Sequence, residues 1–392
     1  MVEYAGARRS RARVRNLEVD AGALVRRFDW VLFGAVAGLV GYGLYLVAGI
    51  TRDDVFGDPD YYVVRQAAYA AAGGVGMLAV SLLDPDVYRR YWRQLYGVAA
   101  VLILLVIPFG TEVRGSQRWL GVGSFTFQPS ELGKLIVALA VAGFLADRVR
   151  RVGEVRIVLG AIAVAVFPAL LVFVQPDIGT SLVYGAVLGA ALFVAGARWL
   201  HIGALVSIIA IAGALVVWLL PSVGVDVLEP YQSDRLTAFV DRSSDPQGAS
   251  YNVQQSILAV GAGGLRGRGV VNATQTNLDY LPEHATDFAF ASLAEQRGFL
   301  GAAILLLLYL LVVWRGLRVA TYATDAFSAI AAGAIVFALL FQVFVNVGMT
   351  MGIAPVTGIP LPFVSVGGSS LVTNLLAVGV LQAIHARGRR RW

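Results

Sequence analysis

Long apolar runs separated by polar gaps dominate the chain from residue 29 to residue 385. The runs at residues 157–174 and 202–220 contain almost no polar side chains. About 20 helical residues cross the roughly 30 Å hydrocarbon core of a membrane, so each run predicts a transmembrane helix. The pattern predicts about ten of them, over residues 29–49, 62–83, 95–110, 128–146, 157–174, 179–197, 202–220, 287–314, 324–348 and 367–385.

The polar segments complete the predicted domain organisation. Residues 1–28 are expected to form a cytoplasmic Arg-rich tail, residues 29–385 a single transmembrane domain, and residues 386–392 a cytoplasmic basic tail. Residues 221–286 form the longest gap and predict one large extracytoplasmic loop, a feature that is usually functional. Apolar residues at helical spacing in 251–260 predict a short interfacial or re-entrant helix in this loop. The predicted fold class is therefore all-α, a polytopic membrane protein.

Composition supports a membrane fold and restricts the chemistry. Hydrophobic residues make up 58% of the chain and charged residues 14%, whereas soluble domains are about half apolar and a quarter charged. Cysteine is absent, which excludes disulfides, thiolate zinc sites and thiol catalysis. Three histidines leave little scope for a His-rich metal site.

The basic residues predict the orientation. Of the 31 basic residues, Lys134 is the only lysine. The arginines cluster in alternate gaps between apolar runs, which is the positive-inside pattern of a membrane protein and not the face of a nucleic-acid-binding protein. The pattern predicts that both termini are cytoplasmic, that the chain contacts membrane lipids, and that it has no nucleic-acid partner.

Two ionisable residues fall inside the fourth predicted helix. Glu131 and Lys134 are three residues apart, so they share a helical face. Charged groups within a membrane are costly and usually functional. A self-satisfied ion pair that orients helices is the alternative interpretation. The single lysine in an arginine-rich chain favours a requirement for a compact ammonium group.

Two further acidic stretches lie at predicted outer boundaries. Asp177, in a turn between two predicted helices, either caps the following helix or pairs with Lys134. Glu283 and Asp287 would share a face if residues 280–288 were helical. Capping by Thr286 or Asp287 is the alternative explanation of that stretch.

In this order, the stretches resemble the SEDS family of bacterial cell-wall polymerases (shape, elongation, division and sporulation), and most closely its RodA branch. The matching segments are residues 115–120, 128–134, 175–180, 255–256, 280–288, 346–349 and 355–370. The last is the most specific, because its Ile359-Pro360-Leu361-Pro362 sequence is typical of the RodA branch.

The resemblance implies polymerisation of lipid II into glycan strands on the outer face of the bacterial cytoplasmic membrane during elongation. It implies that Asp287 is the general base. It also implies a class B penicillin-binding protein as partner, and it leaves room for a divalent cation, Mg²⁺ or Mn²⁺, with no certain cofactor and no identified metal ligands. The substrate-binding residues that it implies are Arg118, Glu131, Lys134, Asp177, Glu283, Ser365 and Ser369.

Two other functions are compatible with parts of the pattern. A lipid II flippase or secondary transporter would use the buried charges as its pathway, and a non-catalytic scaffold would only recruit a transpeptidase. Neither would need the acidic outer stretch at Glu283 and Asp287. Ala326, Ala329 and Gly333 share one face of the ninth predicted helix, which serves either a partner's anchor helix or internal packing.

Overall fold

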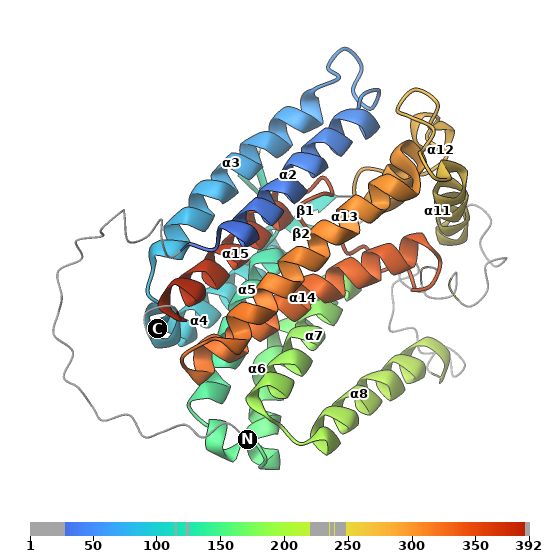
Figure 1. The fold of residues 1–392 in the computed structure, drawn as a ribbon. Coiled ribbons are helices and arrows are strands. Elements are labelled where there is room, and N and C mark those ends of the chain that lie inside the picture. Colours follow the sequence, from blue (N-terminus) through green and yellow to red (C-terminus); the bar gives the residue numbers. More distant parts are fainter. Residues whose placement is uncertain are drawn as a thin grey trace.

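A bundle of long helices forms most of the described chain (Figure 1). The computed structural model describes residues 28–113, 116–122, 125–219, 235, 239 and 248–388. Both predicted tails, except at their inner ends, and much of the predicted outer loop lie outside these residues.

Nine helices in the described part of the chain are long and apolar enough to cross a membrane. They confirm the all-α, multi-pass prediction and match nine of the ten predicted spans. They are α2 (Trp30–Ile50), α3 (Tyr61–Leu82), α4 (Pro85–Phe109), α5 (Pro129–Ala146), α6 (Val155–Val174), α7 (Ile178–Ala195), α13 (Ala289–Thr321), α14 (Ala326–Thr350) and α15 (Gly368–Gly388).

The seventh predicted span is shorter than expected as a regular helix. It consists of α8 (Trp199–Ala214), a helix of 16 residues, followed by the π-helical η2 (Leu215–Leu219). Leu205 is the one residue of α8 recorded as buried. The helix therefore lies at the edge of the bundle, where Figure 1 shows it at the lower right.

The third predicted span begins too late. Helix α4 starts ten residues earlier than the predicted residue 95, at Pro85. Asp84 caps it by accepting a hydrogen bond of 2.9 Å from the Asp86 amide, and proline suits the first helical position. The first turns of α4 contain Arg89 and Arg93. A search for uninterrupted apolar residues therefore misses these turns.

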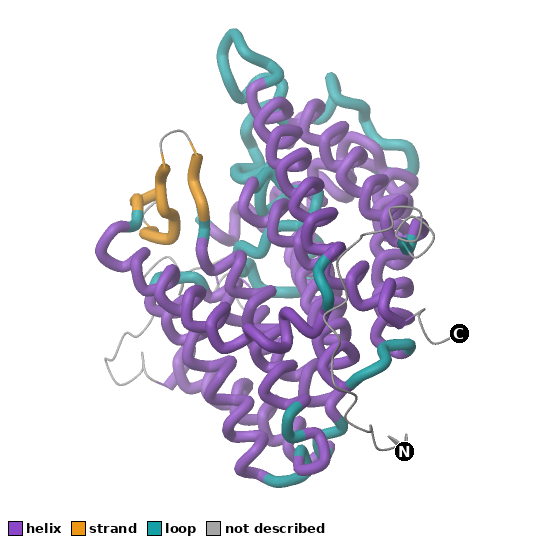
Figure 2. The backbone as a smooth tube through the Cα atoms, turned by 90° about the vertical axis from the view of Figure 1, so that its left-hand side faces the viewer, coloured by secondary structure: helices purple, strands orange, loops and turns teal. Residues whose placement is uncertain are grey.

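A small antiparallel sheet precedes α5, in a segment with no predicted strand. It comprises β1 (Thr111–Val113), β2 (Ser116–Val122) and β3 (Phe125–Phe127), in the order β1-β2-β3. Figure 2 shows the strands beside the ends of the helices. The sheet holds Arg118, on β2, next to the turn that precedes α7.

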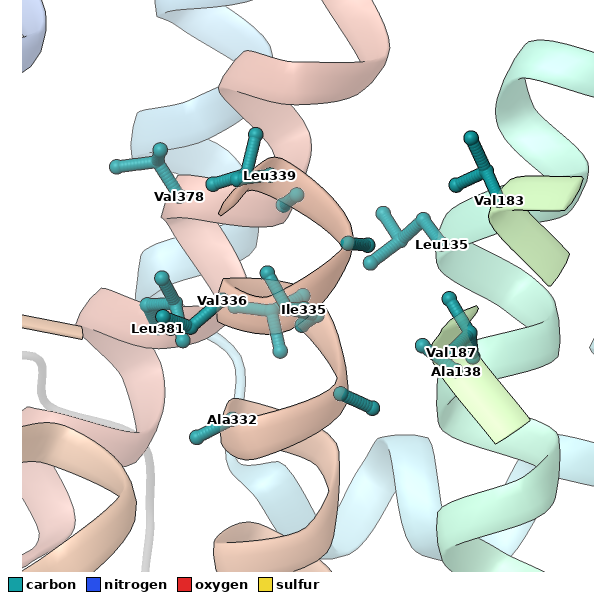
Figure 3. Packing of buried hydrophobic residues seen from close by; sticks show 14 of the residues in the cluster. Leu135, Ala138, Val183, Val187, Ala332, Ile335, Val336, Leu339, Val378 and Leu381 are labelled. Carbon is teal, nitrogen blue, oxygen red and sulfur yellow. The ribbon is translucent and has the colours of Figure 1, made fainter. Parts of the chain in front are cut away.

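Helices α5, α7, α14 and α15 form the centre of the bundle. Figure 3 shows Leu135 of α5 and Val183 of α7 across from Leu339 of α14, with Val378 of α15 behind it. A Cβ added to Gly333 would lie 2.6 Å from Val194 of α7. Of the two open interpretations of this face, the contact supports internal packing at Gly333.

The eighth predicted span, residues 287–314, is divided by a kink. Gly298 has φ 64° and ψ −164°, which interrupts α13. The Phe299 amide donates a 2.8 Å hydrogen bond to the Gly264 carbonyl, and the Gly269 amide donates a 3.0 Å bond to the Gln296 carbonyl. A glycine-rich segment thus takes up the backbone groups that the kink releases.

The same segment follows α11 (Ala249–Gly263) and precedes α12 (Thr274–Asn277). Helix α11 confirms the prediction of a short helix at residues 251–260. Glu295 of α13 accepts hydrogen bonds from the Gln275 and Thr276 amides at 2.9 and 3.0 Å, so a buried carboxylate holds α12 against α13.

Replacing Gly298 with alanine is expected to destabilise the protein. A Cβ there would lie 2.3 Å from the Gly267 nitrogen, and its backbone conformation costs other residues about 1–3 kcal/mol. We expect the melting temperature in detergent to fall by about 5 °C or more. Gly261→Ala is the matched control, because a Cβ at Gly261 meets nothing within 4 Å. Equal melting temperatures for the two variants would contradict this packing.

Candidate active site

Asn346 of α14 connects the two non-helical segments that form the part of the candidate site around Asp287. Its side-chain amide donates to the Asp287 carbonyl at 2.9 Å and to the Ile359 carbonyl at 2.8 Å. Asn346 is completely buried, and its Oδ1 atom accepts no hydrogen bond from the described part of the chain. The backbone that carries Asp287 is therefore fixed from within the bundle.

The loop of residues 355–366 supports the turn of residues 282–288 from its other side. The Val366 amide donates to the Ala285 carbonyl at 2.9 Å. The Ser365 hydroxyl donates to the Thr286 carbonyl at 2.5 Å and accepts a 2.9 Å bond from the Leu361 amide. Ser365 thus uses its hydroxyl to join two backbone segments.

Asp287 faces a cationic side chain from the predicted outer loop. The distance from Arg235 Nη2 to Asp287 Oδ2 is 3.6 Å, and the side chains are 18% and 16% exposed. Gly358 allows this approach, since its φ is 72° and an added Cβ would lie 2.6 Å from Arg235 Nη1. The result is a partly accessible carboxylate next to a guanidinium group.

Residues 280–288 do not form a helix. Glu283 has φ 58°, and helix α13 begins only at Ala289, with Phe288 in the capping position. Glu283 and Asp287 therefore do not share a helical face, and neither Thr286 nor Asp287 is the cap. The Thr286 hydroxyl instead donates a 2.7 Å hydrogen bond to the Glu283 carboxylate.

His284 ties this turn to the segment between α2 and α3. Its Nε2 lies 3.2 Å from Asp54 Oδ1. Burial acts to lower the pKa of the His284 imidazole, but the hydrogen bond and charge of Asp54 outweigh it, so the pKa lies above the ordinary value of 6.5. Sequence patterns gave no sign of this contact, because Asp54 is 230 residues away.

A second cluster lies at the start of α5. Lys134 Nζ is 2.7 Å from Glu131 Oε2, with side chains 6% and 3% exposed. The prediction that the two share a face is confirmed. Lys134 also donates to Gln342 Oε1 of α14 at 2.9 Å, a partner that the sequence did not indicate. The two opposite charges are buried and paired on α5, and the Gln342 side chain of α14 holds the lysine from a second helix.

Asp177 is the cap of α7. It accepts a 3.0 Å hydrogen bond from the Thr180 amide and a 3.1 Å bond from Gln128 Nε2. Of the two open interpretations, capping is confirmed, while the suggested pair with Lys134 is wrong because that lysine binds Glu131 and Gln342.

Gln128 and Arg118 complete the second cluster. The Gln128 backbone amide donates to the Ser369 hydroxyl at 3.0 Å. Gln128 therefore joins the cap of α7, through its side chain, to the start of α15, through its backbone. Arg118 donates from Nε to the Gln175 carbonyl at 3.2 Å and from Nη2 to the Pro176 carbonyl. Ser369 and Arg118 therefore hold backbone in place.

The two clusters lie on either side of residues 357–359. A Cβ added to Gly179 at the start of α7 would lie 2.5 Å from the Thr357 carbonyl oxygen. The next residue, Gly358, adjoins Asp287 and Arg235. All eight predicted site residues thus belong to two clusters that share one loop. Within the described residues, no group of three or more His, Cys, Asp or Glu side chains could hold a metal ion.

Comparison with known proteins identifies the family. The model of the FtsW, RodA and SpoVE family, described as cell cycle proteins, matches residues 29–390. The chain belongs to this family. The resemblance to SEDS proteins is thereby confirmed.

Several relatives and solved structures are similar over most of their length. Peptidoglycan glycosyltransferase MrdB of Escherichia coli K12 is 40% identical over 321 residues, which cover 82% of the chain and 85% of MrdB. Stage V sporulation protein E of Bacillus subtilis 168 is 36% identical over 342 residues, covering 86% of the chain and 90% of that protein.

Two solved structures share the SEDS fold. A chain from work on the structural coordination of polymerization and crosslinking by a peptidoglycan synthase complex has a TM-score of 0.78 and 29% identity, covering 93% of this chain and 99% of that one. The crystal structure of the rod shape determining protein RodA of Thermus thermophilus has a TM-score of 0.68 and 27% identity, covering 93% and 98%.

In this SEDS protein, Lys134→Met is expected to reduce the yield of folded protein. The change leaves the Glu131 charge buried without its partner, and breaking a buried pair costs about 3–5 kcal/mol. Glu131→Gln combined with Lys134→Met removes both charges and should restore the yield, measured by size-exclusion chromatography in detergent. A double variant that also regained activity would contradict a direct catalytic role of Lys134.

Proposed function

We propose that this chain is a peptidoglycan glycosyltransferase that polymerises lipid II, and that Asp287 is its general base. Family membership and 40% identity to a peptidoglycan glycosyltransferase support the activity. The observation that carries the residue assignment is the 3.6 Å pairing of a partly exposed carboxylate with Arg235. We further propose that the reaction serves cell elongation, because residues 359–362 have the RodA-type sequence.

A base must be both accessible and rigidly held. Asp287 is 16% exposed, so a substrate hydroxyl can reach its carboxylate. Its own backbone carbonyl is fixed by Asn346, and the preceding carbonyl, of Thr286, is fixed by Ser365. A carboxylate placed in this way contributes roughly 10²–10⁴-fold by accepting a proton during the reaction.

The proposed reaction is a single displacement. The acceptor hydroxyl oxygen forms a bond to the anomeric carbon of the donor sugar while the bond from that carbon to the diphosphate oxygen breaks. The hydroxyl proton passes to Asp287, and the electron pair leaves with undecaprenyl diphosphate. Arg235 can offset the charge that develops on this leaving group, since a guanidinium binds phosphate oxygens in a bidentate manner. Configuration at the carbon is inverted.

The other predicted site residues divide into three proposed roles. We propose that Glu283 adjoins the substrate, because it lies in the same turn as Asp287. Arg118, Asp177, Ser365 and Ser369 make hydrogen bonds to backbone, which favours a positioning role. Glu131 and Lys134 are buried, which favours a role in fixing α5 and α14.

The donor groups at the site favour a substrate-borne cation. Mg²⁺ commonly binds through one or two carboxylates together with substrate phosphates. Asp287 is one such carboxylate, and Arg235 already supplies positive charge beside it. We infer that any divalent cation arrives with the diphosphate of the substrate. Its chemistry would be to neutralise phosphate charge.

The flippase alternative fits the second cluster poorly. The cavity next to Lys134, also lined by Gln342, Thr373 and Asn374, holds about 20 Å³. That is about the space of one water molecule, which does not suit a lipid pathway. A scaffold and an enzyme differ only in chemistry, so activity must separate them.

The partner and the location follow from family likeness and charge pattern. We propose a class B penicillin-binding protein as partner, supported by the similarity to a chain studied in a peptidoglycan synthase complex. We also propose the bacterial cytoplasmic membrane as location, with both termini cytoplasmic, because the arginine-rich gaps alternate along the chain.

Asp287→Asn should abolish most glycan polymerisation while the protein remains folded. The change keeps the size of the side chain but removes its ability to accept a proton, so the rate should fall by about 100-fold or more. Polymer formed from lipid II in detergent is the measurement, because no lipid movement across a membrane is required. Near-normal polymer from this variant would rule out Asp287 as the base.

Matched variants test the neighbouring residues. Glu283→Gln should be milder than Asp287→Asn. Arg235→Gln should slow polymerisation, whereas Arg266→Gln, an exposed arginine in the glycine-rich segment, should not. If the wild-type protein formed no polymer from lipid II, the scaffold alternative would be favoured. If it formed polymer and none of these variants changed the rate, the proposed roles of Asp287, Glu283 and Arg235 would be wrong.

Reporter fusions test the orientation. A reporter at Trp392 or near Arg150 should report a cytoplasmic position, and one within residues 241–248 an outer position. The reverse result would contradict both the orientation and an outer active site.

A further inference from the structure

A second cavity lies at the other end of α13 from Asp287. It holds about 250 Å³ between the last turns of α13 and α15. Beyond the kink at Gly298, α13 continues to Thr321 without a further break, and these roughly 23 residues at about 1.5 Å each span about 35 Å. The cavity is therefore separate from the candidate active site. Its lining residues are Arg315, Arg318, Val319, Tyr322, Ile384, His385 and Gly388.

Arg315 is held rigidly in the wall of this cavity. Its Nε and Nη2 atoms donate to Asp29 Oδ2 at 3.0 and 2.7 Å. The Asp29 side chain is 1% exposed, and its backbone exchanges two hydrogen bonds with the Gln382 side chain. The Asp29 carboxylate thus fixes one edge of the Arg315 guanidinium. Because it is buried, this carboxylate cannot itself contact a ligand in the cavity.

Arg318 contributes a positive charge that no described residue neutralises through an ion pair. The ion pairs described at this end join Arg315 and, at 4.0 Å, His385 to Asp29, and join Arg387 to Asp84 and Asp86; none includes Arg318. Its guanidinium instead lies over the rings of Trp314 and Tyr322, 5.3 and 5.7 Å from their centroids.

The flanking aromatic residues indicate the level of the lipid headgroups. Trp314 and Tyr322 are 48% and 62% exposed, and such rings concentrate at membrane–water interfaces. Val319 and Ile384 provide apolar walls. The cavity therefore combines positive charge with an apolar wall at a boundary between membrane and water.

We propose that this cavity binds the phosphate of an anionic phospholipid headgroup. Arginine recognises phosphate oxygens through paired hydrogen bonds, and basic pockets between transmembrane helices suit lipid headgroups. A volume of about 250 Å³ is below the roughly 300–1,000 Å³ of sites for drug-sized ligands. It suits one phosphate group and its glycerol unit. On the orientation proposed above, the lipid belongs to the cytoplasmic leaflet.

The test uses the full-length protein purified in detergent. Its melting temperature and binding curve are measured with dioctanoyl phosphatidylglycerol, dioctanoyl phosphatidylcholine and inorganic phosphate. We expect phosphatidylglycerol to raise the melting temperature more than either of the others. Arg318→Gln should weaken phosphatidylglycerol binding about fivefold, the change that about 1 kcal/mol per arginine produces.

Two more variants make the result decisive. Arg156→Gln removes an exposed arginine at the start of α6 and should leave binding unchanged. Gly388→Glu places a carboxylate in the cavity wall and should abolish binding, which gives a second test should Arg318→Gln fold poorly. Equal binding by wild type, Arg318→Gln and Gly388→Glu would overturn the site. An equal response to inorganic phosphate would overturn the lipid and leave a free phosphate site.

Discussion

The need to satisfy backbone polar groups inside a membrane bundle governs the architecture of this protein. Non-helical backbone at such depth is tolerated only where protein or water supplies hydrogen-bond partners. Asn346 supplies two of them, to the carbonyls of Asp287 and Ile359, and Ser365 supplies another, to the Thr286 carbonyl. Without these bonds, the loop and the turn around Asp287 would leave buried carbonyls unpaired, at a cost of about 1–3 kcal/mol each.

Glycines determine where the remaining irregular segments can meet. Gly298 and Gly267 approach so closely that a Cβ on Gly298 would lie 2.3 Å from the Gly267 nitrogen. Gly358 brings the loop up to Arg235 and Asp287 in the same way. The close approach of Gly298 to Gly267 fixes the glycine-rich segment against the kink of α13. These glycines therefore allow tight packing as well as unusual backbone conformations.

The charges of the protein are divided according to burial. Glu131 and Lys134 are almost fully buried and neutralise each other, which favours a structural contribution. Asp287 and Arg235 are partly exposed, so they can exchange their mutual contact for contacts with a substrate. Arg318 is exposed and outside any ion pair described at its end of the bundle. The exposure of each group therefore favours a catalytic role for Asp287 and Arg235 and a ligand-binding role for Arg318.

The apolar pattern alone predicts the nine long helices of the described chain, because an apolar run of about 20 residues has few alternatives in a membrane. The sequence also predicts the Glu131–Lys134 contact, since residues three apart on a helix are neighbours. Three contacts appear only in the folded structure: Gln342 binds Lys134, Asn346 holds the Asp287 backbone, and Arg235 faces the Asp287 carboxylate. Those partners are 208, 59 and 52 residues apart in sequence. No local periodicity encodes such distant contacts, which depend on how helices pack and on where glycines allow backbones to approach.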